Sequence, residues 1–373
     1  MKKILAILLA VAMVMSLAAM AGAEEAVITK VALVTDVGTI DDESFNQACW
    51  QGVESWCTAN GIEYTYYQPT EDSTDARVLS VAQAINEGAN AIVMPGYLFG
   101  TTVLTVQDEY PDVYFIAVDV AAGDLTFDYS NYYDPSANVA CLTFSEEQAG
   151  YLAGWAAVKE GYTKLGFLGG MAVPAVVRYG YGFVQGADAA AAELGLTDVT
   201  MNYAYGNQFS GDADITAAMD TWYSAGTEVV FACGGGIYTS AAEAAAKVDG
   251  KVIGVDTDQS AIIDGGYGEG MTVTSAMKGL AATVKSVLGD LILNDAWSNY
   301  AGQVSTLGLI GEDPEANFVQ LPMASTQFAE GFTEDDYSAL VAAMFNGEIT
   351  VSSDIETEPA VTAITVDYQG NIK

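Results

Sequence analysis

Carboxylates gather where a predicted strand meets a predicted helix, in the stretch VALVTDVGTIDDESFNQACWQG, residues 31–52. The apolar strand ends at Asp36, and three acidic residues at positions 41–43 open the helix. A strand-to-helix turn of this kind usually presents backbone N–H groups to an anion such as phosphate. Here the chain's own negative charge fills that place. Because carboxylates accept hydrogen bonds, the turn suits a neutral ligand that is rich in N–H and O–H donors.

Acidic side chains also end two other predicted strands. VYFIAVD ends at Asp119 and KVIGVD ends at Asp256, and glycines at 169–170 and 234–236 end two more strands. Open parallel sheets bind ligands beyond the carboxyl ends of their strands. We therefore expect two rims of strand ends to face one another across a ligand cleft.

Residues of the first turn have more than one interpretation. Asp36 is either a cap for the turn that follows it or a ligand contact. Phe45 begins an apolar stripe that continues at positions 49, 53 and 56, which indicates a core role. A side chain in the first turn of a helix, however, points toward the helix N-terminus and hence toward the cleft. Asn46 can both donate to and accept from a neutral heterocycle.

Lys278 directly follows the strand MTVTSAM, and we expect it at the start of a helix. A cation in that position opposes the helix dipole by several tenths of a kcal/mol. A nearby carboxylate would offset this cost, and Asp256 is the candidate. An ordinary solvated lysine is the alternative.

Three further patterns give weaker signals. The glycines of ACGGGIY allow close backbone approach, but they do not match GxGxxG and no P-loop lysine follows. The acidic group Asp256, Asp258, Asp264 and Glu269 fails the spacing of a calcium-binding loop, so no metal and no cofactor is expected. The loop DYSNYYD, residues 128–134, either stacks on a ligand or is an exposed turn.

The composition excludes several classes of function. The chain has no histidine, which removes the usual general base and the commonest metal ligand. Its four cysteines show no CxxC or metal spacing and are predicted to be buried free thiols. Without Lys2 and Lys3, 10 basic residues stand against 49 acidic ones, a net charge of −39. Such a surface repels nucleic acid and anionic membranes.

The first 23 residues read as a signal peptide. Two lysines precede an apolar run from Ile4 to Leu17, and Ala21-Gly22-Ala23 forms a small-residue cleavage site. An uncleaved membrane anchor is the alternative, because about 17 residues just span a bilayer. We expect a cleaved, exported and soluble protein, periplasmic or at the cell surface.

Short apolar strands alternate with helices from Val27, and the rhythm restarts near KLGFLGG at residue 164. This pattern predicts an α/β fold with two similar lobes, each built on a parallel sheet covered on both faces. We expect an N-terminal lobe from residues 27–143 and about 277–303. The C-terminal lobe then comprises about 144–276 and 304–373.

Several segments together resemble the basic membrane protein family, the purine-nucleoside-receptor-like substrate-binding proteins of ABC transporters. The specific ones are SFN at 44–46, IGVD-x-DQ at 253–259 and TS-x-x-K at 274–278, supported by EEQAGYLAG, KLGFLGGMAVPAVVRYGYGFVQGA and EVVFACGGG. The resemblance covers nearly the whole mature chain. It implies a type I periplasmic-binding-protein fold, with two Rossmann-like lobes joined by three crossings and a ligand enclosed between them.

The resemblance also implies the ligand contacts. They comprise two stacking rings (Phe45, Phe209), base-edge contacts (Asp36, Asn46), a further polar contact (Asp119) and a ribose clamp (Asp256, Lys278). The glycine pattern at the strand ends adds Gly234 as a predicted ligand-binding residue. The implied ligand is a purine nucleoside (guanosine, inosine or adenosine), and the implied partner is an ABC permease, which provides the only membrane association. Many family members carry a lipid-anchor cysteine at the cleavage site, and AAMAGAEE has none.

Other functions remain open at this stage. Some relatives bind riboflavin, and sugar receptors share the architecture, so another neutral ligand is an alternative. A sensor that works with a membrane receptor would use the same site. A secreted nucleoside hydrolase could cleave with paired carboxylates in place of histidine, but the aspartate spacing does not favour it, and we expect no enzyme activity.

Overall fold

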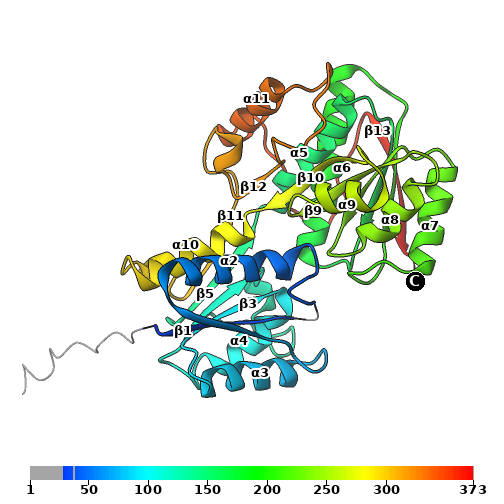
Figure 1. The fold of residues 1–373 in the computed structure, drawn as a ribbon. Helices are drawn as coiled ribbons and strands as arrows, with labels where there is room; N and C mark the ends of the chain where they lie inside the picture. The colour runs from blue at the N-terminus through cyan, green and yellow to red at the C-terminus, as the bar shows by residue number, and fades with distance from the viewer. Residues whose placement is uncertain (1–27, 37, 373) are drawn as a thin grey trace, which may run out of the picture.

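Two parallel sheets organise two lobes, which lie side by side in Figure 1. The computed structural model describes residues 28–36 and 38–372. The predicted signal peptide, residues 1–23, lies outside the described residues. Among the described residues, no helix is both long and apolar enough to cross a membrane.

The N-terminal lobe is built on a sheet with the strand order β11-β5-β4-β3-β1-β2. Its strands are β1 (Lys30–Val34), β2 (Glu63–Tyr67), β3 (Ala91–Pro95), β4 (Tyr114–Val118), β5 (Val139–Phe144) and β11 (Gln303–Leu307). Its helices are α2 (Phe45–Asn60), α3 (Thr74–Asn86), α4 (Gly100–Val106) and α10 (Leu280–Ile292), and α10 packs against α2.

The C-terminal lobe is built on a sheet with the order β12-β10-β9-β8-β6-β7-β13. Its strands are β6 (Lys164–Gly169), β7 (Val199–Tyr205), β8 (Val229–Cys233), β9 (Lys251–Asp256), β10 (Thr272–Lys278), β12 (Val319–Gln320) and β13 (Ile364–Asn371). Its helices are α5 (Glu146–Lys159), α6 (Pro174–Leu194), α7 (Ala213–Ser224), α8 (Tyr238–Ala245), α9 (Ser260–Tyr267) and α11 (Glu334–Phe345).

The two lobes repeat one topology. The order β2-β1-β3-β4-β5 in the first matches β7-β6-β8-β9-β10 in the second, and all these neighbours pair in parallel. Among the strands of the described residues, only β12 runs antiparallel to its neighbour, at the edge of the second sheet. Strands such as β3 and β8 are buried along their whole length, as expected when helices cover both faces of a parallel sheet. The predicted α/β fold with two similar lobes is confirmed.

The chain crosses between the lobes three times, after β5, after β10 and after β11. The first sheet extends a few residues past the expected boundary near residue 303, because β11 pairs with β5 as far as Leu307. The crossings are bonded to one another: Ser145 N donates to Leu307 O, and Gly279 N donates to Phe318 O. One cluster of buried apolar side chains runs through both lobes, so the crossings lie beside a continuous core.

Helices α5 and α6 cross at backbone contact, and this crossing sets where their first residues lie. An added Cβ at Gly182 would come within 2.1 Å of the carbonyl oxygen of Glu147, and one at Gly150 within 2.1 Å of that of Tyr179. Gly154 and Gly186 make equally close approaches along the same crossing. Because interiors are close-packed, no side chain larger than hydrogen fits at these positions.

We predict that Gly182→Ala lowers the free energy of unfolding by about 1–3 kcal/mol, because its methyl group overpacks the α5–α6 contact. Thermal unfolding should show the midpoint fall by several degrees. The matched control is Gly265→Ala in α9, where an added Cβ meets nothing within 4 Å. This control should be neutral or slightly stabilising, since alanine is the better helix former. Equal midpoints for the two variants would contradict the close packing.

Candidate functional site

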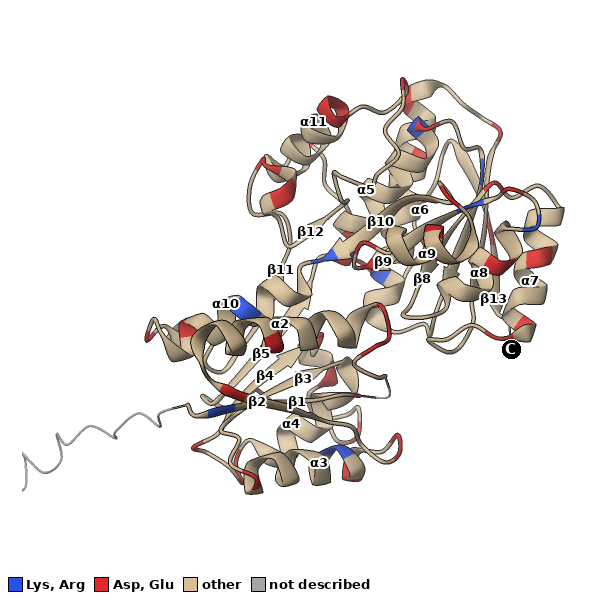
Figure 2. Cartoon of the chain, in the orientation of Figure 1, with Lys and Arg blue, Asp and Glu red and all other residues tan. Residues whose placement is uncertain are grey.

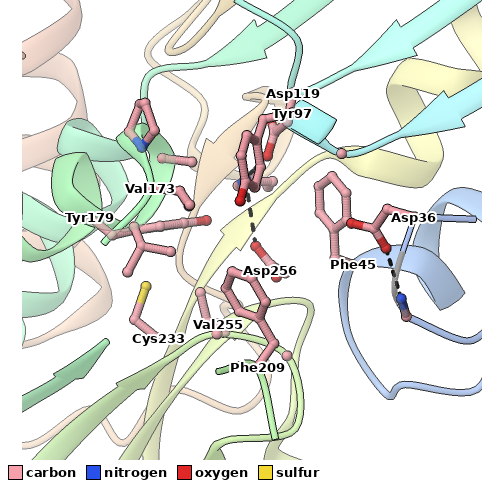
Figure 3. A pocket seen from close by; sticks show the side chains of 18 of the residues that line it. Asp36, Phe45, Tyr97, Asp119, Val173, Tyr179, Phe209, Cys233, Val255 and Asp256 are labelled. Atoms are coloured by element: carbon pink, nitrogen blue, oxygen red, sulfur yellow. Dashed lines mark hydrogen bonds and ion pairs between the residues drawn. The ribbon is translucent and has the colours of Figure 1, made fainter. Parts of the chain in front are cut away.

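A pocket lies between the lobes, and residues at the strand ends of both sheets line it (Figure 3). Its cavity volume is about 150 Å³. All eight residues that the sequence predicted as ligand contacts line this one pocket: Asp36, Phe45, Asn46, Asp119, Phe209, Gly234, Asp256 and Lys278. Their role in binding stays a prediction, but the fold does bring them together.

The ends of β4 and β9 have the same unusual backbone. Asp119 has φ of 61° and Asp256 has φ of 65°, in the left-handed region that residues with side chains seldom adopt. Both residues stand at the carboxyl end of a buried strand, in matching places of the two lobes. Such strain is found mostly at functional sites, where the surrounding structure holds it in place.

Lys278 lies at the centre of a buried ionic cluster. Its Nζ is 2.5 Å from Asp119 Oδ2, 3.2 Å from Glu146 Oε1 and 3.8 Å from Asp256 Oδ1. The expected place at a helix start is wrong: Lys278 is the last residue of β10, two positions before α10 begins. The expected partner Asp256 is present, but Asp119 and Glu146 are closer. Asp119 belongs to the other lobe, so this ion pair crosses the cleft.

Burial and mutual charge shift the pKa values of the cluster. Burial raises the pKa of Asp119 to about 6, Lys278 counteracts this, and Glu146 adds to the rise. Burial likewise raises the pKa of Asp256, against the lowering effects of Lys278 and of a hydrogen bond from Ser44. For Lys278, burial alone would lower the pKa, but Asp119 and the other carboxylates outweigh it and raise the pKa above its ordinary value. Lys278 therefore stays charged.

One of the acidic residues before α2, Asp42, caps the N-terminus of that helix. Asp42 accepts hydrogen bonds from the backbone N–H groups of Ser44, Asn46 and Gln47, at 2.9–3.0 Å. These are the donors that a helix N-terminus leaves unpaired and that an anionic ligand would otherwise take. The side chain of Ser44, the N-cap residue, makes no cap bond and instead donates to Asp256 Oδ2 at 2.9 Å.

Asp36 caps the turn that follows it, and its role as a ligand contact stays a prediction. Its Oδ1 accepts from Gly38 N at 2.9 Å, which caps the turn, and the side chain also lines the pocket. The same oxygen accepts from Asn46 Nδ2 at 3.1 Å, and Asn46 donates to Asp42 as well. These bonds direct Asn46 Oδ1 away from the two carboxylates as a buried acceptor.

Phe45 and Phe209 reach the pocket from opposite lobes (Figure 3). Phe45 is half-buried at the start of α2, and Lys278 Nζ lies 5.1 Å from the centre of its ring, within the range of a cation–π contact. Phe209 rests on strand-end glycines: a Cβ at Gly170 would come within 2.5 Å of its ring, and one at Gly234 within 3.1 Å. The glycine run thus seats an aromatic side chain.

Three polar atoms in the pocket wall have no hydrogen-bond partner among the described residues: Asn46 Oδ1, Asp119 Oδ1 and Tyr179 Oη. Buried polar groups are nearly always paired, and an unpaired one costs about 1–3 kcal/mol. Two of the three are obligate acceptors and one is a hydroxyl. A ligand with several donors would satisfy them.

Reasoning from the sequence missed an ion pair at the pocket, between Glu146 and Arg178. Glu146 is fully buried and joins both cations of the site, with Arg178 Nε 2.6 Å from its Oε2 and Lys278 at its Oε1. Glu146 opens α5 directly after β5, and the rule that strand ends carry site residues would have found it. Arg178 and Tyr179 lie in the second turn of α6, where no strand end marks them.

The pocket carries more negative than positive charge. Five carboxylates and two cations line it: Asp36, Asp42, Asp119, Asp124, Asp256, Arg178 and Lys278. Acidic residues also occur along both lobes, whereas basic residues are few (Figure 2). Within the described part of the chain, no group of three or more His, Cys, Asp or Glu side chains is arranged to hold a metal ion.

Other sequence features have structural roles. In the acidic group weighed as a calcium site, Asp264 accepts bonds from Gly270 N and Thr272 N, and so fixes the loop before β10. All four cysteines are buried free thiols, as predicted. The aromatic loop is an exposed turn closed by the bridge between Thr126 and Tyr132. None of its residues 128–134 lines the pocket.

Two α/β lobes of one topology, with a pocket between their strand ends, define the type I periplasmic-binding-protein fold. Known structures share this fold. A solute-binding protein of an ABC transporter system from Conexibacter woesei superposes with a TM-score of 0.65 at 22% identity, over 87% of this chain and 99% of that one. One from Aeropyrum pernix superposes with a TM-score of 0.64 at 21% identity, over 88% of each chain.

Sequence comparison identifies the family. Residues 28–310 match the Bmp family, described as PnrA-like ABC transporter substrate-binding proteins, and the chain belongs to that family. The ABC transporter nucleoside-binding protein BmpA of Lactococcus lactis is 29% identical over 69% of this chain and 73% of its own length. Basic membrane protein B of Borreliella burgdorferi is 28% identical over 75% of this chain and 78% of its own.

We predict that Lys278→Met lowers the free energy of unfolding by about 3–5 kcal/mol at pH 7.5, because it leaves buried carboxylates without their cation. The difference in the free energy of unfolding between the variant and the wild type should become smaller as the pH falls to 5. In the folded variant the pKa values of Asp119 and Asp256 lie above their unfolded values, so protonation favours the folded state.

Chemical denaturation at several pH values measures this effect. Lys247→Met is the matched control, because Lys247 pairs with Asp220 on the surface, where both side chains are well exposed. An exposed pair contributes about 0–1 kcal/mol. A deficit for Lys278→Met that is no larger than the control, or that grows in acid, would contradict the ionic cluster.

Proposed function

We propose that this protein works outside the cytoplasm, where it captures a purine nucleoside between its lobes and delivers it to an ABC importer. The observation that carries the proposal is the pocket itself. It combines two phenylalanine side chains from opposite lobes with acceptor groups that lack partners among the described residues. A flat base fits between rings, and its N–H groups and the ribose hydroxyls are donors for Asn46 and the carboxylates.

The charge of the site supports a nucleoside over a nucleotide. A phosphate group would enter a pocket in which carboxylates outnumber cations, and the N-terminus of α2 is already capped by Asp42. Both features disfavour an anion. The relative from Lactococcus lactis, whose name includes nucleoside binding, supports the same ligand class.

In the proposed complex, Phe45 and Phe209 stack on the base while Asp36 and Asn46 contact its edge. Asp256 and Lys278 hold the ribose, with Asp119 as a further polar contact and Gly234 seating Phe209. Stacking on an aromatic face contributes about 1–3 kcal/mol per base in nucleic-acid complexes. Two such faces with charged hydrogen bonds make submicromolar affinity a reasonable expectation.

Thermal unfolding of residues 24–373 with a panel of ligands tests the proposal. The panel holds guanosine, inosine, adenosine, cytidine, riboflavin, ribose, glucose and GMP. A ligand at 100 times its Kd stabilises by about 2.7 kcal/mol, which shifts the midpoint by several degrees. We expect shifts with purine nucleosides and none with GMP or ribose. A shift with riboflavin or a sugar alone would contradict the nucleoside proposal.

We predict that Phe45→Ala weakens nucleoside binding at least about tenfold, because it removes one stacking face. Isothermal titration calorimetry measures the affinity. Phe345→Ala is the matched control, since Phe345 is partly exposed at the end of α11 and does not line the pocket. The same affinity for the Phe45 variant and the wild type would show that the ring does not stack on the ligand.

We predict that nucleoside affinity falls as the pH drops through about 6, because Asp119 has its raised pKa there. Protonated Asp119 loses its ion pair with Lys278 and one of its acceptor positions. Titrations between pH 5 and 8 measure the profile. Asp119→Asn should bind more weakly at pH 7.5 and show a flatter profile. A wild-type affinity that is constant across this range would contradict a ligand contact by Asp119.

A further inference from the structure

The start of α2 reaches across the cleft as well as lining it. Ser44 is fully buried, and its hydroxyl donates to Asp256 Oδ2 in the opposite lobe at 2.9 Å. Gln259 Nε2 donates to the backbone carbonyl oxygen of Glu43 at 3.2 Å, and Thr257 Oγ1 lies 3.4 Å from the same oxygen. Residues 43–44 of one lobe thus meet residues 256–259 of the other.

Local structure explains why Ser44 is free to make this bond. Serine at an N-cap position usually accepts a hydrogen bond from its own helix. Here Asp42 accepts those bonds instead, from the N–H groups of residues 44, 46 and 47. The hydroxyl of Ser44 therefore makes no capping bond to its own helix and instead donates to the other lobe.

The backbone of Glu43, whose carbonyl takes part in these contacts between the lobes, is strained. Its φ of 54° lies in the left-handed region, which a residue with a side chain adopts at a cost. Glu43 N donates to Gln47 Oε1 at 2.8 Å, which holds this conformation, and the carbonyl faces Gln259 and Thr257. Gln259 is itself fixed, because its Oε1 accepts from Val255 N at 2.9 Å.

We infer that Ser44 is a positioning residue that couples closure of the lobes to ligand binding. Its hydroxyl fixes one oxygen of Asp256 while the other faces Lys278 at 3.8 Å. Closure therefore orients the carboxylate that, according to the proposed function on which this inference rests, contacts the ribose. Ser44 acts through Asp256, and Gln259 with Thr257 supports the same closed arrangement. We call these contacts of residues 43–44 with 256–259 the cleft latch.

The test compares Ser44→Ala with two other serine variants. Ser44→Ala should weaken purine nucleoside binding about ten- to a hundredfold in titration calorimetry, because it removes a hydrogen bond to a charged group. It should also reduce the ligand-induced fall in the radius of gyration measured by small-angle X-ray scattering. Ser44→Thr keeps the hydroxyl and should restore both properties. Ser55→Ala is the control, because Ser55 lies in the same helix and bonds only to its own helix backbone.

Gln259→Glu provides an independent variant. It keeps the acceptor for Val255 N but replaces the donor to the Glu43 carbonyl with a second acceptor. We expect it to reduce the ligand-induced fall in the radius of gyration, as Ser44→Ala does. Wild-type affinity and compaction in Ser44→Ala, or loss of affinity that Ser44→Thr does not restore, would overturn the inference.

Failure of the proposed function is distinguishable from failure of the latch. If no nucleoside binds the wild-type protein, the proposed ligand is wrong. The latch is then judged with whichever ligand of the thermal-unfolding panel does shift the midpoint, and both Ser44→Ala and Gln259→Glu must reduce the fall in the radius of gyration that this ligand induces. An unchanged ligand-induced fall in both variants overturns the latch.

Discussion

A buried ammonium group must be neutralised, and in this protein that requirement joins the two lobes. Lys278 is almost fully buried, and its carboxylate neighbours come from both sides of the cleft. Removing charges from water costs several kcal/mol per ion, which only close counter-charges offset. Asp119 can approach Lys278 only when the lobes are together. The ionic cluster therefore depends on closure, and closure in turn encloses the ligand site.

The repeated topology supplies the parts of this arrangement. Each lobe ends a central strand in an aspartate with a left-handed backbone, Asp119 in one and Asp256 in the other. Close packing of α5 on α6 then brings Glu146 to Arg178 behind them. A pocket made this way offers acceptors from both lobes and little that attracts an anion. Its chemistry follows from the placement of strand ends, as in other open parallel sheets.

Much of this could be predicted from the sequence, because strand ends and first turns are local features. Apolar runs marked most of the strands, and the motifs that carry the family resemblance contain five of the eight predicted pocket residues: Phe45, Asn46, Gly234, Asp256 and Lys278. The half-exposed edge strand β2 was missed because its pattern is not apolar. The placement of Lys278 at a helix start failed because the strand continues through it. The hydrogen bond from Ser44 to Asp256 joins residues 212 positions apart, so no local sequence pattern could predict it.

The most direct test of the account is a crystal structure of the protein with a purine nucleoside bound. We expect the base to lie between Phe45 and Phe209, and the ribose hydroxyls to contact Asp256 and Lys278. The lobes should be closed, with Asp119 beside Lys278. A base bound outside the two rings, or a nucleoside found only at the surface, would contradict the account.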